Sequence, residues 1–460
     1  MIKRWSILFG LILLIGGILF PKMPFKEVEE TFYRKTPHSK LHTPQQTENI
    51  LATEDLLQWM HNYGGTEEDA AWSVIQTTDG GFALAGSSGS RLFYKAMLIK
   101  TNKQGTVLWT QTYNFSHAME VIQTADGGYA LAGTWNDEIE ANSNAWLVKT
   151  NLLGEIQWIQ IYDLMTKDKA ESVIQMIDGG FVLGGFSAAY GGYWDAWLVK
   201  FDANGNREWT KVYGGSSNDH LFAAIPTTDG GIAFVGDTMS SGEGLNDVWL
   251  GKTDVNGKLL WNHTYGSVDV DRAYSVIQLT NGGFIIFGTT SSYGAGGFDA
   301  WVIQTDAEGI LQWNHTYGGT LHDNAYTGIQ TTDGGFLLAG TTRAIGERRE
   351  DLDLLMVKLD TSGVPQWNQT YGGEQDDEAW SVIQTTDGGF AIAGRTRSYE
   401  AIRWDAWLVK TDPIGVTPDI EVPYLYLIEI ILLVVLIFAA SGVIYLYIKK
   451  KREARPKWRR

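Results

Sequence analysis

The 460-residue sequence contains no cysteine, and it has only 10 prolines. Without cysteine there can be no disulfide framework, thiolate metal site or cysteine nucleophile. Stability must come from packing alone, and a chain of this length can bury enough apolar surface for that. What abounds instead is glycine (53) and aromatic residues (19 Trp, 20 Tyr and 18 Phe). This mixture is typical of many short strands joined by tight turns.

Sequence signatures of catalysis are also missing. The eight histidines are scattered without a His-Glu-x-x-His motif, and no Gly-x-x-x-x-Gly-Lys-Ser/Thr phosphate loop occurs. Aspartates are numerous enough to supply a carboxylate pair for glycoside hydrolysis, but nothing distinguishes one pair from the rest. We therefore predict a binding protein rather than an enzyme. An extracellular hydrolase or lyase that uses such carboxylates remains the alternative.

Positive charge is concentrated at the two ends of the chain. Lys3 and Arg4 supply +2 and the segment 449–460 supplies +7. Because the whole chain has a net charge of −17, the remaining residues sum to −26. An acidic body of this kind disfavours nucleic acid as a partner. It favours cations, cationic surfaces or simple solubility instead. The predicted partner, from the variable loops described below, is an extracellular glycan or protein; the oligomeric state stays open.

Two apolar segments predict a membrane topology. Residues 5–20 are apolar and follow Lys3 and Arg4, so 1–20 is predicted to be a signal peptide or an uncleaved signal anchor. The run Tyr424–Ile448 is interrupted only by Glu429 and reaches about 37 Å as a helix, enough to span a bilayer. The basic tail 449–460 then predicts a cytoplasmic C-terminus and an extracellular domain at the plasma membrane. Residues 21–53 are expected to be a polar spacer and 416–423 a linker, which leaves 54–415 for the folded domain.

Between these segments one unit recurs seven times. Its first mark is Asp-Gly-Gly, which begins at residues 79, 126, 178, 229, 333 and 387 and is varied to Asn-Gly-Gly at 281. The second mark resembles Ala-Trp-Leu-Val-Lys and is centred on residues 97, 146, 197, 249, 301, 355 and 407. The third is a tryptophan before a Tyr-Gly-Gly-like turn, at residues 59, 109, 158, 209, 261, 313 and 367. Three independent marks with one period establish a repeat protein.

The last unit shows how each repeat is expected to fold. The segment 380–386 alternates and is rich in β-branched residues, so it predicts a strand. Asp387-Gly388 predicts a two-residue type I′ hairpin turn, after which 390–394 and 405–410 supply two further strands. Earlier units add a fourth strand, as at 311–317. Four antiparallel strands in about 50 residues is the pattern of a β-propeller blade.

The order of the marks predicts how the ring closes. The chain opens with an isolated fourth strand around Trp59 and ends on a third strand around Trp407. A linear array would leave both strands as exposed edges, whereas pairing them completes the seventh blade. We therefore predict an all-β fold, a seven-bladed β-propeller of four-stranded antiparallel blades with velcro closure. An N-terminal signal or anchor and a C-terminal transmembrane helix complete the chain.

The repeat resembles that of secreted archaeal and bacterial seven-bladed propeller proteins. The resemblance rests on Tyr213-Gly-Gly215 through Asp219, on Asp333-Gly-Gly-Phe336 and on Asp299-Ala-Trp301, and it covers roughly residues 54–413. It implies the propeller architecture and a place at the cell surface. It implies no activity, because such repeats occur in many surface proteins without assigned chemistry.

A repeated aspartate precedes the first strand of nearly every unit. Two interpretations stay open: each carboxylate accepts N–H bonds in its own turn, or the carboxylates form a calcium ring, since clustered carboxylates suit Ca²⁺. A second acidic series precedes the third strand, for example Asp195 and Asp247. Calcium is the only cofactor that the sequence suggests. Its candidate ligands are Asp69, Asp168, Asp219, Asp271, Asp323 and Asp377.

Ligand specificity is expected in the loops between second and third strands, where the units differ. Aromatic and polar side chains in these loops suit contacts with sugars or peptides, although an aromatic ring that packs on its own blade is an equal alternative. The candidate ligand-binding residues are Tyr190, Tyr193, Trp194, Tyr293, Phe298, Trp404, Arg343 and Arg397. Four sequons are candidate glycosylation sites on the outermost strand, Asn114, Asn262, Asn314 and Asn368. The predicted function is a cell-surface binding, adhesion or scaffold ectodomain.

Overall fold

The computed structural model describes residues 59–90, 93–137, 142–163, 167–188, 192–343, 351–399 and 401–413. These residues form 28 strands and no helix. Accordingly, no described segment is a helix with the length and apolarity needed to cross a membrane. The predicted signal segment 1–20, spacer 21–53, linker 416–423, span 424–448 and tail 449–460 lie outside the described residues.

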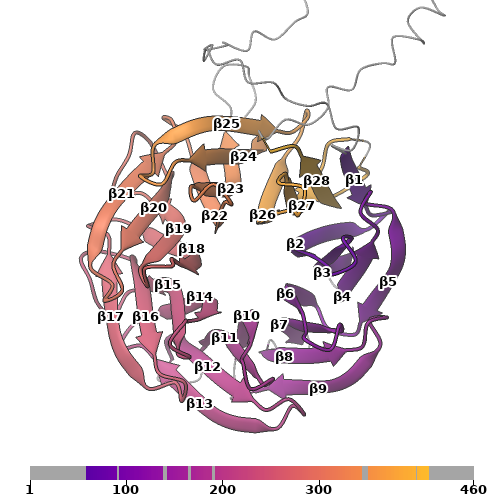
Figure 1. Ribbon diagram of the computed structural model, residues 1–460, viewed down its shortest axis with the longest axis horizontal. Helices are drawn as coiled ribbons and strands as arrows, with labels where there is room; N and C mark the ends of the chain where they lie inside the picture. Colours follow the sequence, from indigo (N-terminus) through magenta and orange to yellow (C-terminus); the bar gives the residue numbers. More distant parts are fainter. Residues whose placement is uncertain are drawn as a thin grey trace, which may run out of the picture. The chain divides into compact units, whose positions relative to one another are not determined.

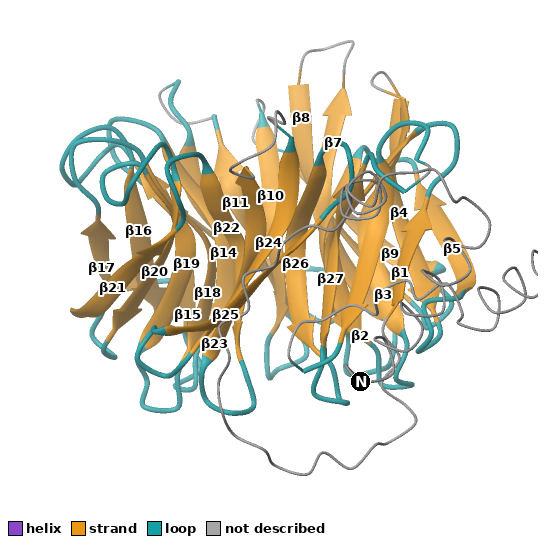
Figure 2. Cartoon of the chain, turned by 90° about the horizontal axis from the view of Figure 1, so that it is seen from above, coloured by secondary structure: helices purple, strands orange, loops and turns teal. Residues whose placement is uncertain are grey.

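The strands form seven antiparallel sheets of four strands arranged around a central axis (Figure 1). This confirms the predicted seven-bladed propeller. We number the blades in chain order, from blade 1 (β2–β5) through blade 6 (β22–β25), with blade 7 made of β26, β27, β28 and β1. Seen from the side, the strands cross the thickness of the ring, and the loops gather at its two faces (Figure 2).

Each blade places its first strand innermost. The innermost strands are β2 (Glu68–Gln76), β6 (His117–Gln123), β10 (Asp168–Gln175), β14 (Asp219–Pro226), β18 (Asp271–Gln278), β22 (Asp323–Gln330) and β26 (Asp377–Gln384). The second strands are β3 (Phe82–Ser90), β7 (Tyr129–Asp137), β11 (Phe181–Ser187), β15 (Ile232–Thr238), β19 (Phe284–Thr290), β23 (Phe336–Arg343) and β27 (Phe390–Thr396). The third strands are β4 (Phe93–Thr101), β8 (Asn142–Thr150), β12 (Asp195–Phe201), β16 (Asp247–Thr253), β20 (Asp299–Thr305), β24 (Leu352–Leu359) and β28 (Asp405–Thr411). The outermost strands are β5 (Val107–Tyr113), β9 (Ile156–Tyr162), β13 (Arg207–Tyr213), β17 (Leu259–Tyr265), β21 (Leu311–Tyr317), β25 (Pro365–Tyr371) and β1 (Trp59–Tyr63).

The ring closes between the first and the last strand. β1 pairs antiparallel with β28, with Trp59 opposite Lys410 and Tyr63 opposite Ala406. The fourth strand of blade 7 thus comes from the start of the described chain and the other three from its end, as the order of the repeat marks predicts. Closure leaves no blade with a missing outer strand.

The core lies between the blades. The cluster around Trp197 joins Leu183 and Phe201 of blade 3 to Ala145 and Leu147 of blade 2, and equivalent clusters occur between the other blades. The third-strand tryptophans are at most 5% exposed, which confirms that they belong to the core: Trp146, Trp197, Trp249, Trp301 and Trp407. Each blade therefore buries apolar side chains against its neighbours.

The Asp-Gly-Gly turn differs from the predicted type I′ hairpin. In blade 7 the N–H of Gly388 donates to the Thr385 carbonyl (2.8 Å) and the N–H of Thr385 to the Gly389 carbonyl (2.9 Å). Gly388 has φ of 85°, whereas Asp387 is not in the left-handed region. These features define a three-residue loop, a type I turn followed by a left-handed glycine. The two-residue prediction was wrong because Asp-Gly satisfies both loop types.

The aspartate of this turn holds a buried lysine of the third strand. Side chains of these lysines are 2–8% exposed, and each ammonium lies 2.5–2.9 Å from its carboxylate. Hydrogen bonds from Lys252 and Thr227 lower the pKa of Asp229 to about 2. The six pairs are Lys100–Asp79, Lys149–Asp126, Lys200–Asp178, Lys252–Asp229, Lys358–Asp333 and Lys410–Asp387.

Blade 5 departs from the pairing at both positions. Asn281 replaces the aspartate, and Gln304 occupies the lysine position. Because a buried lysine without its carboxylate is costly, the loss of one charge is matched by the loss of the other. This accounts for the single variant among the seven turns.

The Tyr-Gly-Gly mark joins neighbouring blades. The hydroxyl of Tyr213 in blade 3 donates to the carbonyl of Gly257 in blade 4 (2.6 Å), and Tyr113, Tyr265 and Tyr317 make the equivalent bonds. The glycine after the tyrosine is required by close approach, because a Cβ at Gly214 would lie 2.3 Å from Asp195 and 2.7 Å from Asp219. The repeat marks are therefore mostly features of the contacts between blades.

Candidate functional site: the axial cavity

Every innermost strand is interrupted at one residue. In blade 1, Ala71 pairs with Gly86 and Ser73 with Ala85, which leaves Trp72 without a partner on β3. Such a β-bulge redirects the extra residue out of the regular alternation. The same shift occurs in all seven blades, and the residues it leaves unpaired are Trp72, Met119, Glu171, Phe222, Tyr274, Tyr326 and Trp380.

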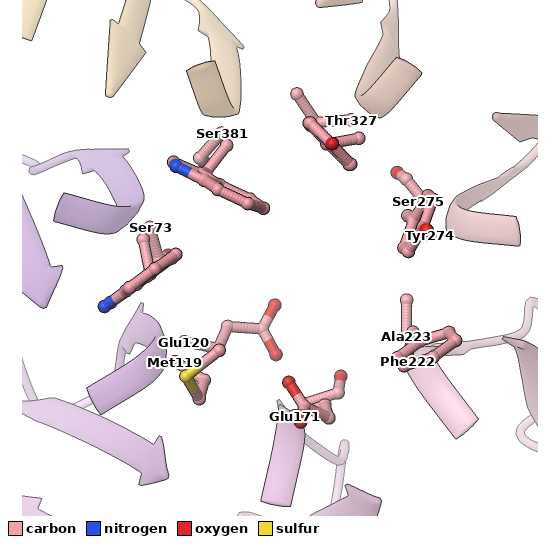
Figure 3. A pocket seen from close by; sticks show the side chains of 14 residues that line it. Ser73, Met119, Glu120, Glu171, Phe222, Ala223, Tyr274, Ser275, Thr327 and Ser381 are labelled. Atoms are coloured by element: carbon pink, nitrogen blue, oxygen red, sulfur yellow. The ribbon is translucent and has the colours of Figure 1, made fainter. Parts of the chain in front are cut away.

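All seven bulge residues line one cavity on the axis of the ring, with a volume of about 320 Å³. Figure 3 shows this cavity with side chains from every blade around it. The residue after each bulge completes the lining: Ser73, Glu120, Ser172, Ala223, Ser275, Thr327 and Ser381. The volume lies at the lower end of the range of about 300–1,000 Å³ for small-molecule sites.

Five of the bulge residues form a continuous arc of aromatic rings. Centroids are 4.9 Å apart for Trp72 and Trp380, 4.6 Å for Trp380 and Tyr326, 5.2 Å for Tyr326 and Tyr274, and 5.4 Å for Tyr274 and Phe222. These separations are those of favourable edge-to-face and offset pairs. We call Trp72, Trp380, Tyr326, Tyr274 and Phe222 the aromatic arc.

The arc is open at blades 2 and 3, where the bulge residues are Met119 and Glu171 and the residue after Met119 is Glu120. Glu120 and Glu171 lie next to each other on one side of the cavity, beside Met119 and across from Thr327 (Figure 3). Burial raises the pKa of each carboxyl to about 7. No lysine, arginine or histidine is among the described residues that line the cavity.

Glu120 also has a structural role. In neighbouring blades the hydroxyl after the bulge accepts an N–H from the next innermost strand: Ser381 from Val74 (3.2 Å) and Ser73 from Val121 (3.3 Å). Glu120 accepts the equivalent N–H of Val173 (2.6 Å). One carboxylate oxygen thus replaces a serine hydroxyl in the contact between blades. Glu171 has no hydrogen-bond partner among the described residues.

Two of the predicted ligand-binding residues lie at the ends of the arc. At one end Phe222 stacks on His220 (5.8 Å), whose ring is 6.2 Å from that of Trp194. At the other end the guanidinium of Arg395 lies 5.8 Å from the ring of Trp72 and 4.1 Å from that of Trp404. Arg397, another predicted residue, lies 5.1 Å from the Trp404 ring. Trp194, Trp404 and Arg397 are thus connected to the cavity wall.

The other predicted loop residues are not brought together. Tyr293 packs on Trp301 of its own blade (5.5 Å) and donates to the Gly266 carbonyl, which matches the alternative interpretation of the loop aromatics. Phe298 lies 5.6 Å from His322, and the N–H of Arg343 bonds to the His322 carbonyl. Tyr193 is half exposed, and Tyr190 lies outside the described residues.

The repeated aspartates are buried in the turns of their own blades. Asp219 accepts the N–H of Gly215 (2.8 Å), the Ser240 hydroxyl (2.6 Å) and the Thr238 hydroxyl. Asp69, Asp271, Asp323 and Asp377 accept the equivalent turn N–H, and Asp168 begins β10 at the same position. Within the described part of the chain, no group of three or more acidic or histidine side chains is placed to hold a metal ion. The hydrogen bonds are those of the turn interpretation, and the calcium ring stays a prediction.

The sequon asparagines are all exposed. Asn262, Asn314 and Asn368 lie on the outermost strands β17, β21 and β25, as predicted. Asn114 lies one residue beyond the end of β5, so its placement on the strand was wrong. The amide oxygens of Asn262 and Asn314 accept the indole N–H of Trp249 and Trp301.

Sequence reasoning missed the aromatic arc and the two glutamates. The cavity position is the third residue after the repeated aspartate, as Trp380 follows Asp377. In a strand without a bulge, side chains alternate between the two faces, so this position would not be expected to face the axis. An alignment of the seven units would have shown aromatic residues there in five of them. Aromatic residues at a position that otherwise varies between units were therefore the sequence signal for the cavity wall.

Comparisons with known proteins locate the chain by its fold alone. The sequence matches no protein-family model, and no curated protein matches it. Its structure is similar to the WD40 β-propeller domain of Doa1, with 13% identity, a TM-score of 0.47, and coverage of 77% of this chain and 96% of that chain. It is also similar to the Neurospora crassa Pan2 WD40 domain (9% identity, TM-score 0.48, 79% and 97% covered). A structure of unknown function from Dyadobacter fermentans gives 13% identity, a TM-score of 0.44, and 77% and 99% coverage. Similarities at this level carry no argument about function, and the assignment as a seven-bladed β-propeller rests on the strand pairing itself.

Proposed function

We propose that this protein is a binding module whose ligand enters the axial cavity from the face of the ring that carries Trp194 and Trp404. The observation that supports it is the aromatic arc with two carboxyls in its opening. The arc joins residues of five blades, so it is a property of the whole ring rather than of one repeat. Half-buried aromatic rings beside a few polar groups are the usual lining of a ligand site.

The carboxyl pair is better suited to binding than to hydrolysis. Glycoside hydrolysis needs one carboxyl kept protonated and another kept ionised, so that acid and base are different groups. Here burial raises the pKa of Glu120 and of Glu171 to the same value of about 7. Glu120 is also engaged by the Val173 N–H, so one of the two carboxyls already serves the contact between blades.

The test is a binding array of glycans, peptides and proteins probed with the purified full-length chain. Hits that depend on the cavity should lose at least tenfold in affinity in Trp380→Ala and Tyr326→Ala. Phe93→Ala is the matched control, because it removes an aromatic ring that is 77% exposed. Equal binding by all three variants would overturn the proposal. Turnover of a glycan that is lost in Glu171→Gln would instead establish the hydrolase alternative.

We also propose that the propeller is an ectodomain at the plasma membrane. The support is the sequence alone: the apolar segments 1–20 and 424–448 and the basic residues that follow the second. In intact cells an external protease should reach a tag placed in the spacer 21–53. A tag after Arg460 should be reached only after the membrane is permeabilised, and the opposite pattern would refute the topology.

A further inference from the structure

Positive charge lies over the arc at its Trp72 end and, at its other end, over Phe186, whose ring is 5.8 Å from that of Phe222. The ammonium of Lys169 lies 5.6 Å from the ring of Phe186 and 5.9 Å from that of Trp194. Arg395 lies over Trp72 and Trp404 at the other end. Aromatic faces attract cations through their quadrupole, and these contacts show that Trp72 of the arc and the rings of Phe186, Trp194 and Trp404 beside it present faces to charge.

The middle of the arc has the same chemistry, and Arg272, whose side chain hydrogen-bonds to that of Tyr274, is already paired with Asp237. No described Lys or Arg lies over the rings of Tyr274, Tyr326 or Trp380. Within the same cavity, Glu120 and Glu171 add two carboxyls to the wall where the arc is open. Negative ring faces and carboxylates therefore surround one half-buried space.

The alternatives to a cation fit this space poorly. An anion would meet two carboxyls and no basic residue among the described lining. A neutral apolar group would cover the carboxyls without replacing their hydration, which is costly. A cation compensates the carboxylates and contacts the rings at once, and a desolvated cation–π contact contributes about 2 kcal/mol or more.

We propose that the axial cavity binds an organic cation, an alkylammonium or guanidinium group held between the aromatic arc and Glu120 and Glu171. This inference rests on the proposed binding function and names the ligand class for the same site. The cation comes either from a free small amine or from a lysine or arginine side chain of a partner polypeptide. Both sources share the headgroup that the cavity recognises.

The first experiment compares two small probes of equal shape. Choline carries a quaternary ammonium, and 3,3-dimethylbutan-1-ol replaces its nitrogen by carbon and so removes the charge. Calorimetric titration of the full-length chain should show choline binding at least tenfold more tightly than the alcohol. Glu171→Gln should remove most of that difference, because it keeps the size of the side chain but not its charge. Glu308→Gln, an exposed glutamate in a turn, is the matched control and should leave choline binding unchanged.

A second arm identifies the source of the cation. Spermidine represents free amines, and a short lysine peptide is compared with the same peptide containing norleucine. Preference for the lysine peptide over both norleucine and spermidine assigns the cavity to a partner polypeptide, and preference for spermidine assigns it to a free amine.

The pH dependence supplies a readout that a purely structural role would not give. The titratable groups near the pair are Glu120 and Glu171 themselves, Lys169 on β10, Tyr274 and Tyr326 across the cavity, and His220 stacked on Phe222. Arg272 beside Tyr274 and Arg395 near Tyr326 add charges that stay constant over the pH range tested. Burial raises the pKa of both tyrosines, so they stay neutral below pH 9. Choline affinity should rise between pH 6 and 8 as the carboxyls ionise. The rise should vanish in the double variant Glu120→Gln/Glu171→Gln, which leaves His220 and Lys169 in place.

The results separate this inference from the proposed function. Equal affinity for choline and the alcohol, or no binding of any cation by a folded wild-type protein, overturns the cation proposal. If array ligands still require Trp380 but carry no positive charge, the binding function stands and only the ligand class is wrong. If no ligand depends on Trp380, both proposals fail. Circular dichroism of each variant checks that the ring is folded.

Discussion

The repeated contacts of the blades and the wall of the axial cavity follow opposite rules, although both are built from the same repeat. In the repeated contacts the residues barely change: six of the seven Asp-Gly-Gly-type turns hold a buried lysine from the third strand of the same blade, and the seventh blade changes both partners together. At the bulge, one position holds Trp, Met, Glu, Phe and Tyr in different blades. Uniform residues are required wherever every blade makes the same contact. The variety at the bulge is what we expect of the proposed ligand site.

The largest expected effect is on stability, and it separates a tryptophan between blades from a tryptophan of the cavity wall when each is replaced by alanine. Trp197→Ala, which empties a fully buried site, should lower the free energy of unfolding by about 3–5 kcal/mol. Trp380→Ala, in the half-buried cavity wall, should cost about 1–2 kcal/mol and mainly reduce ligand binding. Urea unfolding followed by circular dichroism measures both. Equal stability losses would show that the arc is part of the core rather than a separate surface.

A second prediction concerns the pH dependence that Glu171 gives to stability. Its pKa is about 7 in the folded protein and raised from 4.5, so the folded state holds a proton that the unfolded state releases. Stability from this group therefore falls as pH rises from about 4.5 to 7 and is constant above. Glu171→Gln should melt at the same temperature as wild type near pH 4.5 and a few degrees higher at pH 8. A melting difference that does not change with pH would contradict the assignment.

Blade 5 lacks the ion pair between turn and third strand that the other six blades have, and two substitutions would introduce it. Asn281→Asp together with Gln304→Lys would install the ion pair of the other six blades. Each single change leaves one charge without its partner and should destabilise, whereas the pair should show a favourable coupling of about 1 kcal/mol. A double-mutant cycle measured by urea unfolding gives this value. Additive single effects would mean that the two positions do not interact.

The smallest effect is expected from one hydrogen bond between blades. Tyr213→Phe removes the donor to the Gly257 carbonyl and should cost about 1 kcal/mol. Choline binding should not change, because Tyr213 is not among the residues that line the cavity. A loss of binding in this variant would show that the contacts between blades and the cavity are coupled.

The architecture was predictable because its marks are local and repeated. Asp387-Gly388 requires a turn, Trp407 requires burial, and the offset of Trp59 from the last unit requires closure, so each inference needed only a few residues. The cavity was not predictable in the same way. Whether Trp380 points to the axis depends on a bulge between Ala379 and Ser381, and neither residue type indicates one. The loops, where specificity was expected, supplied Trp194, Trp404 and Arg397, and only His220 and Arg395 of the strands connect them to the bulge residues.

The closure of the ring has a mechanical consequence. β1 and β28 are adjacent strands of one blade, so the chain enters and leaves the propeller at neighbouring points. A force that pulls the two flanking segments apart would load a single ladder, in which Trp59–Tyr63 faces residues 406–410, before it reached any other blade. Those five residue pairs hold the ring closed. The load at which they separate sets the tension under which the closed ring keeps its shape.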